Sequence, residues 1–111
     1  MDHRIRVVCF EIESDTGSCL GINELSRIVN LSSSRLRHLF KAETGETLAQ
    51  FRKRVRLGEA QVLLSTTFMS IKEIMHKVGV GSDSHFARDF KEASGLSPTQ
   101  YRVRSQKSRS L

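Results

Sequence analysis

Apolar residues recur at helical spacing along most of the chain, and short polar or glycine-containing segments separate one run from the next. Asp2 can cap a first helix, whose apolar side consists of Ile5, Val8, Cys9 and Ile12. We expect this side to pack on the helices that follow, because two short helices are too small to close a core alone. A dimerisation stripe is the alternative use of the same residues.

Two shorter helices follow, and a turn separates them. The first has Asn23 as its expected cap and ends near residues 30–31. Serines 32–34 can cap the second, which we expect over about residues 33–44, and Gly45 then releases the chain. Their inward side chains should be Leu25, Ile28, Val29, Leu36, Leu39 and Phe40.

A longer helix is expected over about residues 47–65, opened by Thr47. Its interior Gly58 costs about 1 kcal/mol relative to alanine, but the apolar period continues on both sides of it. The residues that carry this period are Leu48, Phe51, Val55, Val62, Leu63 and Leu64.

The last third of the chain again predicts two short helices and a turn. Ser70 and Glu73 form a capping box before the first of them, and the second, over about residues 83–94, ends at Gly95. Ser97 and Pro98 predict one more short helix. The expected inward residues are Ile71, Ile74, Met75, Val78, Phe86, Phe90, Ala93 and Tyr101.

No alternating pattern of the kind that predicts strands competes with these helices, so we expect an all-α fold of about seven helices. One domain should cover residues 1–104. Residues 105–111 form a basic tail with little apolar content, which we expect to be disordered.

The two halves of the chain resemble each other. Residues 24–25 (Glu-Leu) match 73–74 (Glu-Ile), and residues 36–45 match 86–95 in the positions of a Phe-Lys pair and a closing glycine. The offset is 49 residues before the turn and 50 after it, so the second turn should be one residue longer. We therefore expect two helix-turn-helix subdomains, at about 4–45 and 70–104, joined by the long helix.

The composition adds an electrostatic preference. Lys and Arg number 18 against 12 Asp and Glu, a formal net charge of +6, which favours an anionic partner without choosing among DNA, RNA and membrane surfaces. No apolar run approaches the roughly 18 residues of a membrane span, and no signal segment opens the chain, so we expect a cytoplasmic protein. Cys9 and Cys19 lack metal-type or redox-type spacing and should remain thiols.

The repeat, the linking helix and the closing pattern Gly95-x-Ser97-Pro98-x-x-Tyr101 together resemble the DNA-binding domain of the AraC/XylS family of bacterial transcription regulators. The resemblance extends from about residue 4 to 102. It implies a regulator, more often an activator, that binds double-stranded DNA and contacts RNA polymerase. The chain departs from the family pattern at His38, Met75 and Val80, where arginine, alanine and phenylalanine are usual.

Two helix faces are candidates for reading bases. With the apolar residues inward, helical geometry turns the polar and cationic residues of both second helices outward, where a recognition helix enters the major groove. The resemblance implies base contacts from the same positions, with His38 the least certain because its usual arginine is missing. The candidates are Ser34, Arg35, Arg37, His38, Asp83, Ser84, His85, Ala87 and Arg88.

Further residues are candidates for phosphate contacts, because they are cationic or lie near helix starts, where backbone amides favour anions. An ordinary solvated surface is the alternative for the basic cluster that opens the linking helix. The candidates are Ser32, Ser33, Lys41, Arg52, Lys53, Arg54, Arg56, Lys72 and Lys91.

A linking helix of about 18 residues would be ~27 Å long. This length suits two base-reading helices held near the ~34 Å that separates successive major grooves. One monomer could then read two half-sites, so we expect a monomer rather than a dimer. The chain leaves no residues for a separate small-molecule effector domain, so it is either a stand-alone regulator or a fragment of a longer one.

Other classes of function fit less well. The scattered histidines and the absence of catalytic motifs argue against an enzyme, a metal site and a cofactor. Two alternatives stay open. The first is a helical protein-interaction module, for example an antagonist of a related regulator, and the second is a nonspecific DNA architectural protein.

Overall fold

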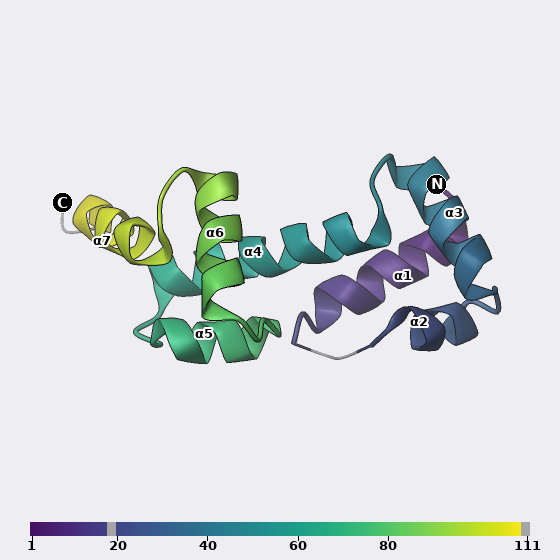
Figure 1. The fold of residues 1–111 in the computed structure, drawn as a ribbon, viewed down its shortest axis with the longest axis horizontal. Helices are drawn as coiled ribbons and strands as arrows, with labels where there is room; N and C mark the ends of the chain where they lie inside the picture. The colour runs from purple at the N-terminus through teal and green to yellow at the C-terminus, as the bar shows by residue number, and fades with distance from the viewer. Residues whose placement is uncertain (18–19, 110–111) are drawn as a thin grey trace. The chain divides into compact units, whose positions relative to one another are not determined.

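The computed structural model describes residues 1–17 and 20–109, and over these residues its regular structure is entirely helical. Cys19 and the last two residues of the tail lie outside the described residues. The predicted all-α fold is confirmed. The helices are α1 (His3–Ser14), α2 (Ile22–Ile28), α3 (Ser33–Thr44), α4 (Leu48–Thr66), α5 (Ile71–Val78), α6 (Asp83–Ser94) and α7 (Pro98–Arg109) (Figure 1). None of them has the length and apolar content needed to cross a membrane.

Most helix starts follow the predicted caps. Asp2 accepts a hydrogen bond from the Arg4 amide at 2.9 Å, and both bonds of the Ser70–Glu73 capping box are present. The hydrogen bond from the Ser70 amide holds the pKa of Glu73 below its ordinary value. The prediction for Asn23 is wrong, because α2 begins at Ile22 and its cap position is Gly21, two residues before Asn23.

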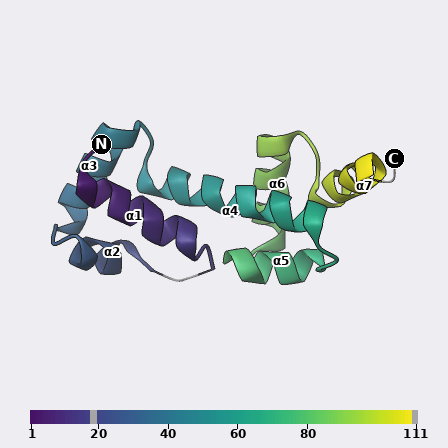
Figure 2. The same cartoon turned by 180° about the vertical axis from the view of Figure 1, so that it is seen from behind.

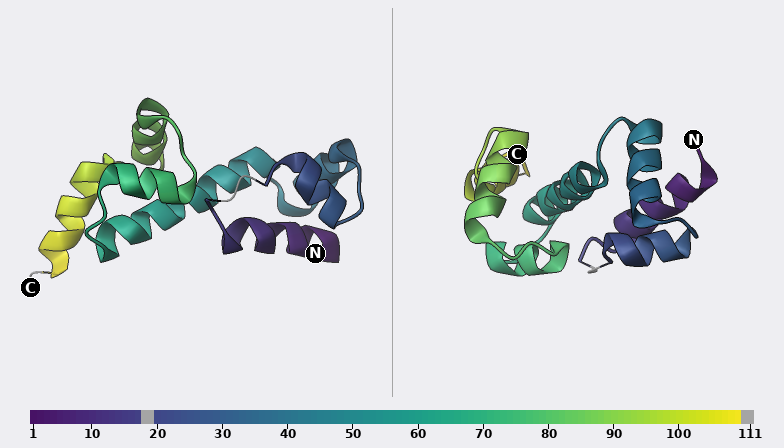
Figure 3. Two further views of the ribbon diagram at one scale, coloured as in Figure 1. Left: turned by 90° about the horizontal axis from the view of Figure 1, so that it is seen from below. Right: turned by 45° about the vertical axis from the view of Figure 1, so that its right-hand side comes forward.

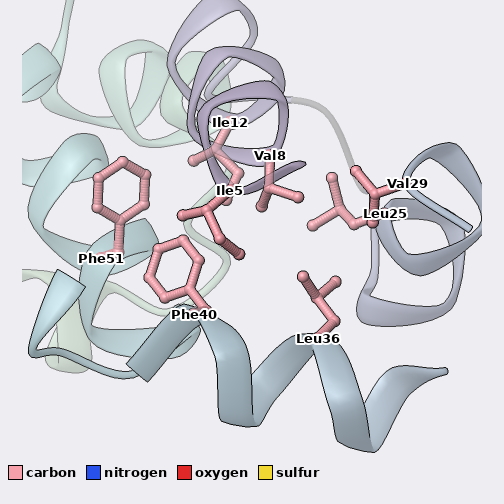
Figure 4. Close-up of a cluster of buried hydrophobic side chains, with 8 residues drawn as sticks. All are labelled: Ile5, Val8, Ile12, Leu25, Val29, Leu36, Phe40 and Phe51. Carbon is pink, nitrogen blue, oxygen red and sulfur yellow. The ribbon is translucent and has the colours of Figure 1, made fainter. Parts of the chain in front are cut away.

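The helices form two compact units, and the boundary between them falls between Val55 and Arg56, inside α4. The first unit contains α1, α2, α3 and the start of α4, which the view from behind also shows (Figure 2). Figure 4 shows its core, where α1 side chains meet those of the following helices. This confirms that α1 packs within its own unit. The core consists of Ile5, Val8, Ile12, Leu25, Val29, Leu36, Phe40 and Phe51.

The second unit is built from the rest of α4 with α5, α6 and α7 (Figure 3). Met75, a departure from the family pattern, is 5% exposed in its core, and Val80 packs against that core. Both residues therefore fill apolar space. The buried residues of this core are Leu57, Ala60, Leu64, Ile74, Met75, Val78, Phe86 and Phe90.

The structural repeat is longer than the sequence comparison indicated. Ile5, Val8 and Ile12 of α1 have the same spacing and the same role as Leu57, Ala60 and Leu64 of α4. The second half of α4 is thus the lead helix of the second unit. Both halves of the helix over residues 48–66 thus contribute to a core, Phe51 to the first and Leu57, Ala60 and Leu64 to the second.

Each unit is also closed in the same way by the helix that follows its helix-turn-helix, α4 after α3 and α7 after α6. The ring centres of Phe51 and Phe40 lie 5.4 Å apart, and so do those of Tyr101 and Phe90. Both pairs pack edge to face. Such aromatic pairs stabilise a core beyond the area they bury. The next residues, Arg52 and Arg102, stand at equivalent positions, 50 apart.

Both of these arginines donate hydrogen bonds to backbone carbonyls of the segment that precedes a helix-turn-helix. Arg52 donates to the carbonyl of Leu20, before α2. Arg102 donates to the carbonyls of Leu64 at 3.2 Å and Thr67 at 3.4 Å, before α5. Each arginine ties the closing helix of its unit to the start of the same unit's helix pair.

Several predicted inward residues are exposed instead. Ala93 and Val62 are exposed, and Ile28 is 49% exposed, because each lies off the buried side of its helix. The predicted disordered tail also differs from the structure, since α7 continues to Arg109. Arginine, glutamine and lysine, which favour helices even without burial, occupy much of this extension.

Replacing Arg102 by alanine should lower the free energy of unfolding by about 1–3 kcal/mol, because two part-buried carbonyls lose a charged donor. Urea unfolding of the 111-residue chain measures this change. Lys107→Ala, an exposed change on the same helix, is the control and should shift stability by less than about 0.5 kcal/mol. Equal effects of the two changes would show that the Arg102 bonds do not stabilise the unit.

Candidate nucleic-acid interface

The first candidate reading helix, α3, is positioned by a tight turn after α2. Asn30 takes a left-handed conformation with φ of 57°, which asparagine tolerates better than most residues. The Leu31 amide then donates to the Ser26 carbonyl at 2.9 Å, and Ser32 caps α3 by accepting from the Arg35 amide. This turn fixes where α3 begins.

The second reading helix, α6, follows a turn of the same type. Gly79 has φ of 84°, and the Val80 amide donates to the Met75 carbonyl at 2.9 Å. Ser82 accepts from the His85 amide at 3.4 Å and caps α6. One residue, Leu31, separates the left-handed residue from the cap in the first turn, whereas two separate them in the second. The predicted extra residue is confirmed.

The predicted outward faces are exposed on both helices. In α3, Leu36 and Phe40 are fully buried. The candidates for base contacts on the opposite face are exposed, namely Ser34, Arg35, Arg37 and His38. In α6, Phe86 and Phe90 are buried, and the corresponding exposed set is Asp83, Ser84, His85, Ala87 and Arg88. Each helix thus brings its candidate residues together on one accessible face.

Two contacts at these faces were not foreseen from the sequence. Arg88 Nε lies 3.6 Å from a carboxylate oxygen of Asp89, and the Arg88 side chain remains 62% exposed. Ser33 Oγ donates to Asn23 Oδ1 at 2.8 Å, which links the start of α2 to the start of α3. The adjacency of Asp89 to Arg88 was a usable signal in the sequence, but the approach of Asn23 to Ser33 depends on the turn.

The candidate phosphate contacts of the first reading helix are partly engaged within the protein. Ser32 Oγ accepts the capping bond, and Ser33 Oγ donates to Asn23. Lys41 Nζ donates to the carbonyl of Gly45 at 3.0 Å. Lys91, its counterpart on α6, is exposed, as is Lys72 near the start of α5.

The basic cluster at the start of α4 is not one uniform surface. Arg52 donates to the Leu20 carbonyl, and the Nε of Arg56 is buried and has no hydrogen-bond partner among residues 1–17 and 20–109. Arg54 lies 5.2 Å from the centre of the Phe51 ring and 2.7 Å from a carboxylate oxygen of Glu46. The hydrogen bond that Arg54 donates to Glu46 raises the pKa of Arg54 above its ordinary value.

Lys53 and Arg54 are the exposed members of this cluster, and the side chain of Arg54 is 64% exposed. A phosphate could reach Arg54 only in competition with Glu46. The cluster therefore combines residues that stabilise the fold with residues that an anion can approach. Neither interpretation from the sequence, a set of phosphate contacts or an ordinary solvated surface, describes all its members.

Comparison with known proteins gives the same picture along most of the chain. A family model described as "Helix-turn-helix domain" matches residues 25–104. The arabinose operon regulatory protein of Escherichia coli strain K12 is 37% identical over 104 residues, which are 93% of this chain and 36% of that protein. The chain thus spans about a third of the length of the curated relatives it matches.

Solved structures share the fold. The C-terminal domain of AraT, a response regulator from Geobacillus stearothermophilus, has a TM-score of 0.84 at 28% identity, covering 92% of this chain and 85% of that one. The DNA-binding domain of AdpA, solved in complex with a target DNA, has a TM-score of 0.90 at 22% identity and covers 99% of both chains. At that identity the second likeness concerns the fold alone.

Proposed function

The chain belongs to the AraC/XylS family of helix-turn-helix transcription regulators, and from this membership we propose that it regulates transcription by binding specific sequences of double-stranded DNA in the bacterial cytoplasm. The single observation that carries the proposal is the repeated unit. Two equivalent helices, α3 and α6, follow equivalent turns and expose polar and cationic faces over buried apolar ones.

Each reading helix would enter a major groove by its N-terminal half. There an arginine can donate to both O6 and N7 of a guanine, and an alanine methyl can contact the methyl group of a thymine. In this proposal the base-reading residues are Ser34, Arg35, Arg37, His38, Asp83, Ser84, His85, Ala87 and Arg88.

Phosphate contacts would orient these helices without reading sequence. The exposed cations Lys53, Arg54, Lys72 and Lys91 are the best supported, because an anion can reach them. Arg52, Arg56 and Lys41 are supported less well, since the first and last bind backbone carbonyls and the Arg56 Nε is buried. Ser32 and Ser33 would act mainly through the helix start that they form.

One copy carries two reading helices, so in this proposal a monomer recognises two half-sites in successive major grooves and needs no palindrome. The role is that of an activator in contact with RNA polymerase. The family membership supports this role.

Selection of bound duplexes from a random DNA pool at near-physiological salt tests the proposal. We expect the survivors to share two short blocks whose centres lie about 10 base pairs apart, one helical turn. Binding without enrichment of any sequence would support a nonspecific architectural protein instead. Failure to bind any duplex would support a protein-interaction module and overturn the proposal.

Arg88→Ala should weaken binding to the selected site by about 1–3 kcal/mol and relax the preference at one base position of one block. Titration against the selected duplex and its single-base variants measures both effects. Asp89→Asn, which removes the neighbouring carboxylate, should keep the preference. If Arg88→Ala leaves the base preference unchanged, Arg88 is not a reader.

Glu46→Gln should strengthen binding to every duplex, because it removes the carboxylate that competes with phosphate for Arg54. Arg54→Ala should weaken binding on all sequences and reduce the slope of log affinity against log salt by about 0.9. Salt titrations of both variants on specific and unrelated duplexes measure these effects. An unchanged slope for Arg54→Ala would mean that Arg54 serves only the fold.

A further inference from the structure

The first unit has an open groove between α1, the end of α3 and the start of α4, with a volume of about 510 Å³. Its lining includes the rings of Phe10 and Phe51 and the half-buried thiol of Cys9. Burial raises the pKa of this thiol, so it presents a neutral surface at physiological pH. The floor of the groove is therefore largely apolar.

Phe10 shows that this floor is not needed to complete the core. Three residues of α1, Ile5, Val8 and Ile12, are buried in the core, whereas Phe10 lies on another side of the helix and is 67% exposed. Met1, which also lines the groove, is 62% exposed. Two large apolar side chains thus face solvent at one place, as is typical of a contact surface.

The charges around the groove indicate the chemistry of a protein partner. Three carboxylates line it, from Glu13, Glu43 and Glu46, against the two guanidinium groups of Arg6 and Arg54. Arg54 is paired with Glu46, whereas Glu13 and Glu43 form no ion pair within the part of the chain that the structure describes. The groove suits an apolar side chain flanked by cations.

The chain itself carries such a segment in α7. Val103 is 49% exposed, and the exposed Lys107 lies on the same side of the helix, four residues further on. No acidic residue occurs in Pro98–Arg109. We propose that the groove of one copy receives the Val103 face of α7 from a second copy, with Lys107 against Glu43.

This contact joins two different surfaces, so a single such contact arranges copies head to tail. One face of a single helix buries much less than the roughly 800 Å² per partner of a stable complex, so free copies at micromolar concentration stay monomeric. DNA that holds two copies side by side raises their effective concentration to the millimolar range. The contact then makes two copies bind cooperatively to DNA sites that are repeated in one orientation. This step rests on the proposed function.

The test uses the complete chain and DNA that carries two copies of the selected site, in direct or inverted orientation and at spacings varied over about 10 base pairs. We expect the second copy to bind about tenfold more tightly than the first in direct orientation at one spacing, and independently in inverted orientation. Independent binding at every direct spacing would overturn the proposal.

Charge exchange tests the two surfaces. Glu43→Lys and Lys107→Glu should each reduce the tenfold cooperativity to less than about twofold, and the double variant should restore it. Phe10→Ser should have the same effect as either single variant. Phe68→Ser is the matched control, because Phe68 is 98% exposed in the α4–α5 connection and should not affect cooperativity. Failure of the double variant to restore cooperativity would remove α7 as the occupant.

Two further measurements separate this proposal from the proposed function. Affinity for a single site, measured for each variant, reports DNA binding alone, and its loss in the unaltered chain would count against the proposed function only. NMR spectra of the free chain from about 20 µM to about 1 mM report the contact without DNA. We expect concentration-dependent shifts at both Phe10 and Val103, and unchanged spectra would overturn the contact.

Discussion

The packing of an aromatic ring from the next helix onto the recognition helix is the contact on which each unit depends. Two short helices and a turn expose too much apolar surface to be stable alone. Phe51 covers Phe40 in the first unit, and Tyr101 covers Phe90 in the second. Because these rings close the inner side of α3 and α6, the opposite side of each helix can consist almost entirely of polar residues.

Burial and capping explain why so much of the fold was predictable. The serine, threonine and aspartate caps, the glycine stops and the apolar period are local signals, and the structure follows them at nearly every helix. Asn23 was misassigned because Gly21 and Asn23 are both acceptable caps, and only the packing of Ile22 and Leu25 decides between them. The end of α7 was missed because intrinsic helix propensity maintains a helix there without a buried face.

The candidate site was predictable in its outward direction but not in its internal contacts. Helical geometry alone puts Arg37 and Arg88 on exposed faces. It does not say that Asp89 would lie against Arg88, or that Glu46, eight residues before Arg54, would pair with it. Such pairs depend on loop paths and side-chain rotamers, and they make ligand binding an exchange of partners rather than a simple addition.

The equivalence of α7 and α4 shows how one position can separate a helix that begins a core from one that does not. Each helix closes the unit before it, and α4 goes on to supply the first core residue of the next unit at Leu57. The same position in α7, 50 residues later, is Lys107. A cation there gives α7 a solvated position where α4 has a buried one, much as solenoid proteins exchange an apolar face for a polar one where a module faces water.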